Sequence, residues 1–255
     1  MTADPLSPFR MDGRVAIVTG ASSGLGAGFA RALAGVGARL VLVARRGHRL
    51  QEVAEELAGT KAETVSVVAD VSRPDDCRRI VESAVEAFGA LDVLVNNAGV
   101  GRAVPASKET VDGFRSVIDV NLNGAFWMAQ AAAAVMPPGS SIVNIASVLG
   151  LTAPRYPQAA YAASKAGLIG LTRDLAQEWS GRKGIRVNAL CPGYFLTEIN
   201  ADHAARQAEM VEANTILGRF GEQWELDCAL LFLASRASSF VTGIALPVDG
   251  GYTAL

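Results

Sequence analysis

Seven short apolar runs, rich in β-branched residues, alternate along the chain with longer stretches of helical character. Most of these runs are continuously apolar, with no alternation of polar and apolar positions. Strands of this kind are buried on both faces, as parallel strands covered by helices are. The pattern therefore predicts an α/β fold with a doubly wound parallel sheet of seven strands and helices on both faces. The predicted strands are 15–19, 40–44, 65–69, 91–96, 141–146, 185–190 and 244–248.

Between the strands the sequence predicts helices, and no linker rich in Pro, Gly or Ser and no internal repeat divides the chain. Its 255 residues therefore indicate a single domain, with residues 1–12 as an N-terminal extension. The least regular long segment, 193–220, follows the sixth strand and is expected to form a lid over the substrate. The predicted helices are 24–36, 47–58, 74–88, 107–135, 160–181, 199–214 and 222–234.

Composition argues against several other classes of protein. A net charge of −2 offers no basic surface for nucleic acid. The N-terminus lacks the apolar segment of a secretory signal, and the longest Ala-rich run is too short to cross a bilayer, so no membrane partner is expected. Three widely spaced cysteines fit free thiols in a reducing cytoplasm. The two histidines have no partner at metal-ligand spacing, and no metal site is predicted.

A glycine-rich segment, TGASSGLG at 19–26, follows the first predicted strand directly. Gly20 permits a tight turn, Gly24 lets the backbone approach a pyrophosphate, and Gly26 lets the next helix pack closely on the strand. The N-terminus of that helix offers free N–H groups and the positive end of its dipole to an anion. The segment predicts nucleotide binding through Gly20, Ser22, Ser23, Gly24, Leu25 and Gly26.

The end of the second strand favours NADP over NAD. An acidic residue at this point would bind the ribose 2′-hydroxyl of NAD. The chain instead has Ala44 followed by Arg45 and Arg46. No carboxylate is present to repel a 2′-phosphate, and two guanidinium groups are available to bind one through charge-assisted hydrogen bonds.

Two further motifs occur where adenosine and ribose would lie. Asp70 and Val71 follow the third strand, and a carboxylate there can accept a hydrogen bond from the adenine amino group. The fourth strand ends in Asn97, Ala98 and Gly99, where small residues allow the chain to pass beside a cofactor. Taken singly, either motif could also be an ordinary turn at a strand end.

Tyr161 and Lys165 lie four residues apart, fourteen residues or more after Ser147. Residues at this spacing share one face of a helix. A positive charge beside a phenol favours the phenolate and lowers a pKa that is ordinarily about 10. The pair therefore indicates a group that moves a proton, with a serine hydroxyl near enough to join it.

Together these motifs resemble the short-chain dehydrogenase/reductase family in its compact form of about 250 residues, which implies a Rossmann-like dinucleotide-binding domain. The resemblance runs from Gly13 to Tyr252. It is carried by TGASSGLG, the Asp70 position, NNAG at 96–99, Asn121 in VNLNG, Ser147, YAASK at 161–165, Pro192-Gly193 with Thr197, and VDGG at 248–251.

The resemblance also implies a role for each site residue. Tyr161 would be the general acid in reduction and the base in oxidation, and Lys165 would lower its pKa and hold the nicotinamide ribose. Ser147 would orient the substrate oxygen, and Asn121 would link a water chain to Lys165. The nicotinamide carboxamide would be held by Pro192, Gly193, Phe195 and Thr197.

The substrate is not specified by these motifs. One residue more than is common in the family separates Ser147 from Tyr161, which makes the wall of the pocket unusual. Its expected lining residues are Leu149, Tyr156 and Tyr194. The leading interpretation is an NADP-dependent carbonyl reductase, reversible as an alcohol dehydrogenase. The alternatives are a 3-oxoacyl-thioester reductase, a sugar or polyol dehydrogenase and, more remotely, a non-catalytic NADP-sensing regulator.

Small apolar residues on several faces of the helices 107–135 and 160–181 predict a homotetramer or homodimer.

Overall fold

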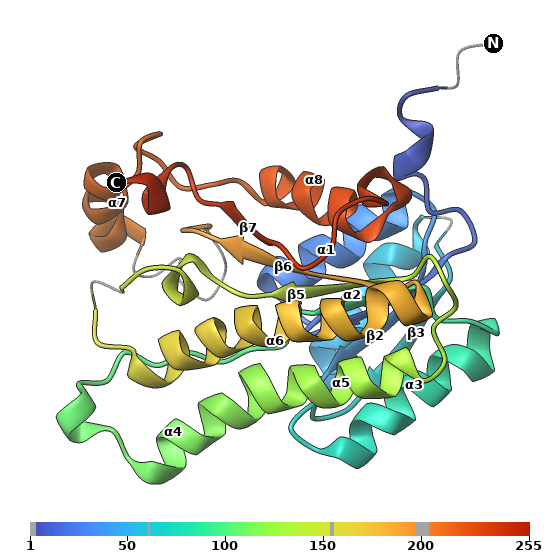
Figure 1. The fold of residues 1–255 in the computed structure, drawn as a ribbon, viewed down its shortest axis with the longest axis horizontal. Coiled ribbons are helices and arrows are strands. Elements are labelled where there is room, and N and C mark those ends of the chain that lie inside the picture. The colour runs from blue at the N-terminus through green and yellow to red at the C-terminus, as the bar shows by residue number, and fades with distance from the viewer. Residues whose placement is uncertain (1–3, 61, 154–155, 197–203) are drawn as a thin grey trace.

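The computed structural model describes residues 4–60, 62–153, 156–196 and 204–255, and it contains one parallel sheet (Figure 1). The seven strands of this described part lie in the order β3-β2-β1-β4-β5-β6-β7. Their order reverses between β1 and β4, which are neighbours in the sheet. The prediction of a doubly wound seven-stranded sheet is confirmed. The strands are β1 Val15–Thr19, β2 Arg39–Ala44, β3 Thr64–Val68, β4 Val93–Asn96, β5 Ser141–Ile145, β6 Arg186–Pro192 and β7 Ala245–Val248.

Helices cover both faces of the sheet. On one face α1 (Gly24–Gly35), α2 (Gly47–Ala58) and α8 (Gln223–Ala234) pack on alternate residues of β1, β2, β4 and β5. On the other face α3 (Pro74–Phe88), α5 (Gly124–Ala133) and α6 (Ala159–Lys183) pack on the remaining residues. Because the central strands give side chains to both layers, most of their residues are apolar, as the sequence indicates.

The long helix predicted over 107–135 is divided into three parts. Thr110 caps α4 (Val111–Ile118) by accepting a hydrogen bond of 3.0 Å from the Gly113 backbone N–H. A π-helical turn, Asp119–Asn123, then separates α4 from α5. Such turns widen a helix locally and occur often at functional sites. Asn121 stands inside this turn and is 1% exposed.

A chain of buried amides ties α6 to the centre of the sheet. Asn96 at the end of β4 donates a hydrogen bond of 2.9 Å to Oδ1 of Asn144 in β5. Asn144 in turn donates one of 2.9 Å to the hydroxyl of Thr172 in α6. Since buried polar groups need partners, these bonds favour one placement of α6 against the sheet.

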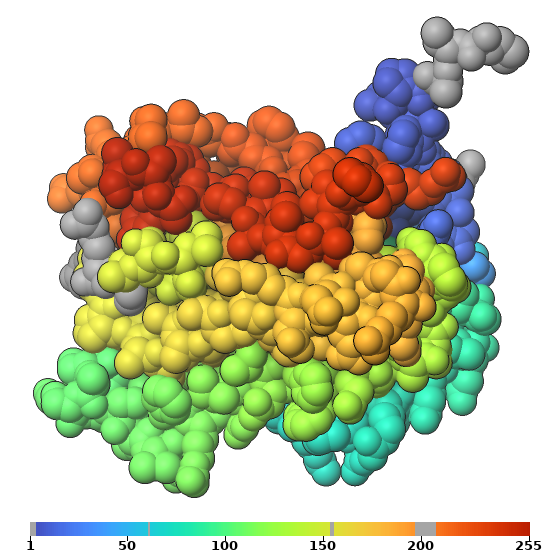
Figure 2. Space-filling view, in the orientation of Figure 1, coloured from blue at the N-terminus to red at the C-terminus, as the bar shows by residue number. Residues whose placement is uncertain are grey.

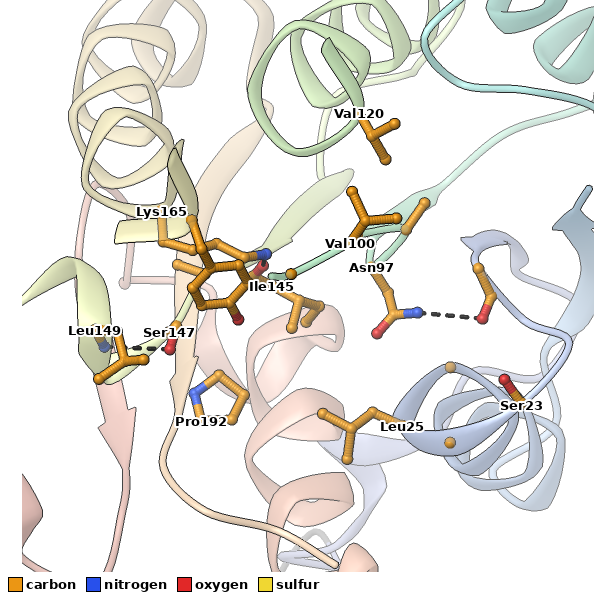
Figure 3. Close-up of a pocket in the computed structure, with 18 of the residues that line it drawn as sticks. Ser23, Leu25, Asn97, Val100, Val120, Ile145, Ser147, Leu149, Lys165 and Pro192 are labelled. Carbon is orange, nitrogen blue, oxygen red and sulfur yellow. Dashed lines mark hydrogen bonds between the residues drawn. The ribbon is translucent and has the colours of Figure 1, made fainter. Parts of the chain in front are cut away.

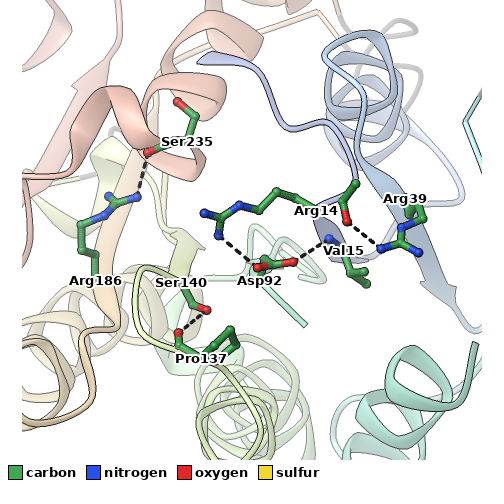
Figure 4. A network of polar contacts seen from close by, with 9 residues as sticks. Arg14, Val15, Arg39, Asp92, Pro137, Ser140, Arg186 and Ser235 are labelled. Carbon is green, nitrogen blue, oxygen red and sulfur yellow. Dashed lines mark hydrogen bonds and ion pairs between the residues drawn. The ribbon is translucent and has the colours of Figure 1, made fainter. Parts of the chain in front are cut away.

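Arginine side chains close the amino edge of the sheet (Figure 4). Arg14 pairs with Asp92 at 3.0 Å, and Asp92 also accepts a hydrogen bond of 2.9 Å from the Val15 backbone N–H. Arg186 is 8% exposed and donates to the carbonyl oxygens of Leu233 and Ser235, where α8 ends. The amino edge is thus filled with polar contacts, and the cavity described below lies at the opposite, carboxyl edge.

Two of the segments singled out in the sequence are described in part. The extension 1–12 contains a short 3₁₀ helix, Ser7–Phe9, and includes Met11, which is 2% exposed and belongs to the core on the α1 side. Of the expected lid, the structure describes 193–196 and 204–220, including α7 (Ala204–Asn214). Its closure over a substrate stays a prediction.

The surface seen in Figure 2 shows α6 as a band between the C-terminal residues and the helices α4 and α5. Small residues that were expected to meet another subunit divide into two groups. Those of α5 are buried within the protomer: Ala125, Ala129, Ala132 and Ala133. In α6, Ala163 and Gly170 are exposed. The assembly therefore stays a prediction that rests on α6.

Candidate active site

A cavity of about 860 Å³ opens at the carboxyl edge of the sheet, across the point where β1 and β4 lie side by side (Figure 3). This is where doubly wound sheets bind ligands, because the connections leave in opposite directions there. Its lining comes from the ends of β1 through β6 and from the N-terminus of α6. The sequence-predicted residues that line it are Gly20, Ser22, Ser23, Gly24, Leu25, Gly26, Arg45, Arg46, Asp70, Val71, Asn97, Ala98, Gly99, Ser147, Leu149, Tyr156, Tyr161, Lys165, Pro192, Gly193 and Tyr194.

The loop between β1 and α1 forms one end of this cavity. Gly20 and Gly24 have φ angles of +68° and +53°, which side chains other than glycine adopt only with strain. A Cβ atom on Gly26 would clash with the Gly20 carbonyl oxygen and with the Asn97 amide. The loop therefore depends on all three glycines, and it leaves the N-terminus of α1 open to the cavity.

Thr19, the last residue of β1, joins this loop to the end of β4. Its hydroxyl accepts hydrogen bonds of 3.0 Å from the backbone N–H groups of Asn97 and Ala98 and donates one of 3.2 Å to the Val95 carbonyl. The side-chain amide of Asn97 donates a hydrogen bond of 2.9 Å to the Thr19 carbonyl oxygen. These contacts fix the two strand ends against each other at the reversal point. Thr19 was not among the predicted site residues, although a hydroxyl that ends an apolar strand is a visible signal.

The two arginines after β2 take different partners. Nη2 of Arg46 donates hydrogen bonds of 3.2 Å to the Ser22 hydroxyl and 2.7 Å to the Ser23 hydroxyl. Arg45 instead approaches Asp70, with Nη1 and Oδ2 at 3.8 Å. Arg46 thus stands with two hydroxyls beside the glycine-rich loop, a set of donors that fits a phosphate group.

At the other end of the cavity lie Tyr161, Ser147 and Lys165. Tyr161 and Ser147 both line the cavity, and the Ser147 hydroxyl is near enough to act on the pKa of the Tyr161 phenol. The Ser147 hydroxyl also accepts a bond of 3.1 Å from the Leu149 backbone N–H, which orients it at the start of a short 3₁₀ helix, Val148–Gly150. Gly150 allows that helix to lie on α6, since a Cβ there would be 2.7 Å from the Lys165 backbone. Helical spacing and this close contact together bring the three side chains to one place.

Burial dominates the protonation of this group. Burial raises the pKa of Tyr161 above its usual value, and the nearby Ser147 hydroxyl offsets part of this rise. Burial lowers the pKa of Lys165 to about 8, and the neighbouring Cys191 thiol acts in the opposite direction. The Lys165 Nζ atom lies 5.6 Å from the centre of the Tyr161 ring. Lys165 was expected to lower the pKa of Tyr161 by favouring the phenolate. In the protein without a cofactor, burial disfavours the phenolate more strongly, and the pKa is raised.

Asn121 does not line the cavity but holds a loop that does. Its Nδ2 atom donates to the Val100 carbonyl at 2.9 Å and to the Ser164 hydroxyl at 3.0 Å. Its Oδ1 atom accepts a bond of 2.8 Å from the Val100 backbone N–H. Both amide hydrogens are thus used inside the protein. A link from Asn121 through a water chain to Lys165, which the resemblance implies, stays a prediction.

The substrate end has an apolar and aromatic wall. Val148, Leu149 and Tyr252 form a small buried cluster, against which Tyr161 and Tyr194 pack. Gln158, which also lines the cavity, pairs with Val104 in an isolated β-bridge. The lining residues that sequence reasoning did not single out here include Val100, Gly101, Arg102, Gln158 and Met210. Nothing local in the sequence marks them, because packing brings together the loop after β4, the start of α6 and the helix α7.

Phe195, like Asn121, does not belong to the cavity lining. Phe195 is 6% exposed, and its side chain belongs to the core cluster on the α1 side. Any contact of Phe195 with a cofactor would therefore come from its backbone. Thr197 lies outside the described residues. In the described part of the chain, no three His, Cys, Asp or Glu side chains are placed to hold a metal ion. None of the described helices has the length and apolarity to cross a membrane.

Comparison with known proteins assigns this architecture to a family. Residues 20–253 match the family model described as enoyl-(acyl carrier protein) reductase. The chain is 44% identical over 252 residues to galactitol 2-dehydrogenase (L-tagatose-forming) of Cereibacter sphaeroides, covering 96% of this chain and 97% of that protein. It is 37% identical over 244 residues to a 3-oxoacyl-(acyl-carrier-protein) reductase of Thermotoga maritima, covering 95% and 98%.

Among solved structures, a gluconate 5-dehydrogenase of Burkholderia cenocepacia J2315, in complex with NADP and tartrate, superposes with a TM-score of 0.89 at 36% identity. The match covers 99% of this chain and 100% of that one. With the sheet order, the glycine-rich loop and the Ser147–Tyr161–Lys165 group on the same scaffold, the chain belongs to the short-chain dehydrogenase/reductase family of oxidoreductases.

Proposed function

We propose that the protein is an NADP(H)-dependent oxidoreductase that interconverts a ketone or aldehyde and the corresponding alcohol. The observation that carries this proposal is that Tyr161, Ser147 and Lys165 line one end of a cavity whose other end is a glycine-rich loop. A hydroxyl that can give or take a proton therefore faces the space in which a cofactor and a carbonyl group would meet.

The residues present fit NADP. The glycine loop and the open N-terminus of α1 suit a pyrophosphate, and Arg46 with Ser22 and Ser23 suits a 2′-phosphate. A related gluconate 5-dehydrogenase binds NADP on the same fold, which supports this choice. The bound cofactor supplies or accepts the hydride.

The side chains handle the proton. In the reducing direction the Ser147 hydroxyl holds the substrate oxygen, and Tyr161 gives its phenolic proton to that oxygen as negative charge develops. A raised pKa keeps Tyr161 protonated and ready to donate. The charged form of Lys165 stabilises the phenolate that remains. In the oxidising direction each of these steps runs backwards.

The decisive test is Tyr161→Phe, which removes the phenolic hydroxyl and keeps the aromatic ring. Turnover of NADPH with a panel of ketones, followed by absorbance, should fall by a factor of about 10² or more. Calorimetry should show NADPH binding unchanged. Full activity in the variant would reject Tyr161 as the acid and base. A wild-type protein that binds NADPH but reduces nothing in the panel would favour the remote alternative, a regulator that senses NADP.

For the substrate we propose a polyhydroxylated compound, because the galactitol dehydrogenase is 44% identical and the gluconate dehydrogenase has the same fold. Arg102 favours a carboxylate-bearing substrate within this class. It lines the cavity beside Gly101, whose Cβ position lies 3.2 Å from the Tyr161 ring, and its contact with Glu109 is a weak one at 4.0 Å. Arg102→Gln should lower kcat/KM about tenfold for gluconate and leave galactitol unaffected. Equal effects on both substrates would reject the carboxylate.

A second candidate is reduction of a 3-oxoacyl thioester, which the 37% identical Thermotoga maritima reductase supports. Assay with an acetoacetyl thioester beside gluconate and galactitol separates the two.

We also propose a homotetramer or homodimer located in the cytoplasm. Light scattering that gives the mass of a monomer at micromolar concentration would contradict the assembly.

A further inference from the structure

The loop that lines the cavity after β4 is held by side-chain contacts rather than by sheet pairing. Val100 stands between Gly99 and Gly101, two residues with no side chain to pack. Its backbone N–H and carbonyl both bond to the Asn121 amide, at 2.8 Å and 2.9 Å. The position of this loop therefore depends on how firmly Asn121 is held.

Ser164 completes the contacts of Asn121. Its hydroxyl accepts the second Nδ2 hydrogen of Asn121 at 3.0 Å and donates to the Tyr161 carbonyl oxygen at 2.7 Å. Ser164 is 0% exposed. A buried amide hydrogen without an acceptor is costly, so Ser164 determines which orientation of Asn121 is stable.

These contacts form a closed circuit around the site. It runs from the Tyr161 backbone through Ser164 and Asn121 to Val100, and it returns where Gly101 lies against the Tyr161 ring. The Gly99 Cβ position lies 3.4 Å from Oδ1 of Asn121 and 3.6 Å from the Lys165 Nζ atom, so the same loop also borders the lysine. A shift of Asn121 would move the loop relative to both ionisable groups.

We propose that Ser164 is a positioning residue, which orients Asn121 and thereby holds the 99–101 loop against Tyr161 and Lys165. This inference rests on the proposed function for its effect on turnover. Its structural part, the restraint on Val100, can be measured without any substrate.

The test compares Ser164→Ala with Ser180→Ala. Ser180 lies in the same helix, and its hydroxyl donates to the Ile185 carbonyl at 2.9 Å, away from the cavity. Hydrogen exchange of the Val100 amide, followed by NMR or by mass spectrometry of the peptide that contains it, should accelerate about tenfold in Ser164→Ala. It should not change in Ser180→Ala. Unchanged exchange in Ser164→Ala would overturn the proposal, whether or not the enzyme turns over any substrate tested.

Turnover supplies a second readout. Ser164→Ala should lower kcat about tenfold and leave KM for NADPH within about twofold, because the loop is displaced but the phosphate end is not. Ser164→Thr keeps a hydroxyl that can donate and accept, and it should recover most of the loss. In the double variant with Asn121→Ala, activity should fall no further than in Asn121→Ala alone. Additive losses would show that Ser164 acts independently of Asn121 and would overturn the proposal.

If Ser164→Thr does not fold, the proposal is still tested by hydrogen exchange in Ser164→Ala. It is also tested by the activity of the double variant with Asn121→Ala. If Tyr161→Phe keeps full activity while the Val100 exchange responds as expected, the proposed function fails and the positioning of the loop by Ser164 stands.

Discussion

The Nζ atom of Lys165 donates a hydrogen bond of 2.7 Å to the carbonyl oxygen of Ile145, the last residue of β5. The lysine is therefore anchored to the sheet, and its ammonium is buried, with 4% of the residue exposed. A buried ammonium favours its neutral form, and the pKa of Lys165 falls to about 8 for this reason. The residue that is proposed to support Tyr161 is thus itself costly to keep charged.

This cost predicts how stability depends on pH. The pKa of Lys165 is about 8 in the folded protein and 10.5 when unperturbed, so between these values the unfolded chain binds more protons. Stability contributed by Lys165 should therefore rise from pH 8 to 10.5, by about 3 kcal/mol in total, and should be constant below pH 8. The measurement is the free energy of unfolding of the wild type minus that of Lys165→Met across this range.

Subtracting the variant removes the titration of all other groups. Lys183→Met is a matched control, since Lys183 also donates from α6 to a carbonyl, that of Ala133, but is exposed. If the free energy of unfolding of the wild type minus that of Lys165→Met is constant from pH 8 to 10.5, burial does not destabilise the Lys165 charge.

Arg46 and Arg45 should differ in their effect on cofactor choice. Arg46→Ala removes the guanidinium that lies on Ser22 and Ser23, and it should raise KM for NADPH about ten- to hundredfold with little change for NADH. Arg45→Ala should have a smaller effect, because Arg45 is directed to Asp70. Steady-state kinetics with both cofactors measures this. A larger effect from Arg45→Ala would reverse the assignment.

Gly26→Ala should weaken cofactor binding through the shape of the loop. The new Cβ atom would collide with the Gly20 carbonyl oxygen, which is backbone and cannot move aside cheaply. We expect a loss of about 1–3 kcal/mol in stability together with weaker NADPH binding, read by thermal unfolding with and without NADPH. Gly35→Ala in the same helix is the control: no atom lies within 4 Å of its Cβ position, and the change should stabilise by up to about 1 kcal/mol. Equal behaviour of the two variants would contradict the close packing at Gly26.

Thr19→Val keeps the shape of the side chain and removes its hydroxyl. The backbone N–H groups of Asn97 and Ala98 would lose their acceptor, so unfolding by denaturant should show a loss of about 1–3 kcal/mol. Thr64→Val in β3 provides the comparison, because the Thr64 side chain is partly exposed. Losses of similar size at both positions would mean that the hydrogen bonds of Thr19 are not what joins the two strand ends.

Much of the architecture follows from local pattern. The helices predicted at 47–58 and 74–88 coincide with α2 and α3, since their apolar spacing and the glycine and proline at their starts act within one turn. The prediction of one continuous helix over 107–135 was wrong. A π-helical turn depends on what Asn121 contacts outside the helix, namely Val100 and Ser164, and helical periodicity does not carry that information.

By itself the sequence determined the alternation of strands and helices, the glycine-rich loop and the shared face of Tyr161 and Lys165, because each depends on residues close together in the chain. Only the tertiary structure decided that Arg46 rather than Arg45 lies on the loop, that the Phe195 ring belongs to the core, and that Asn121 clamps Val100. It also decided that burial raises the pKa of Tyr161. These features depend on solvent exclusion and on distances between elements far apart in the sequence, which only packing sets.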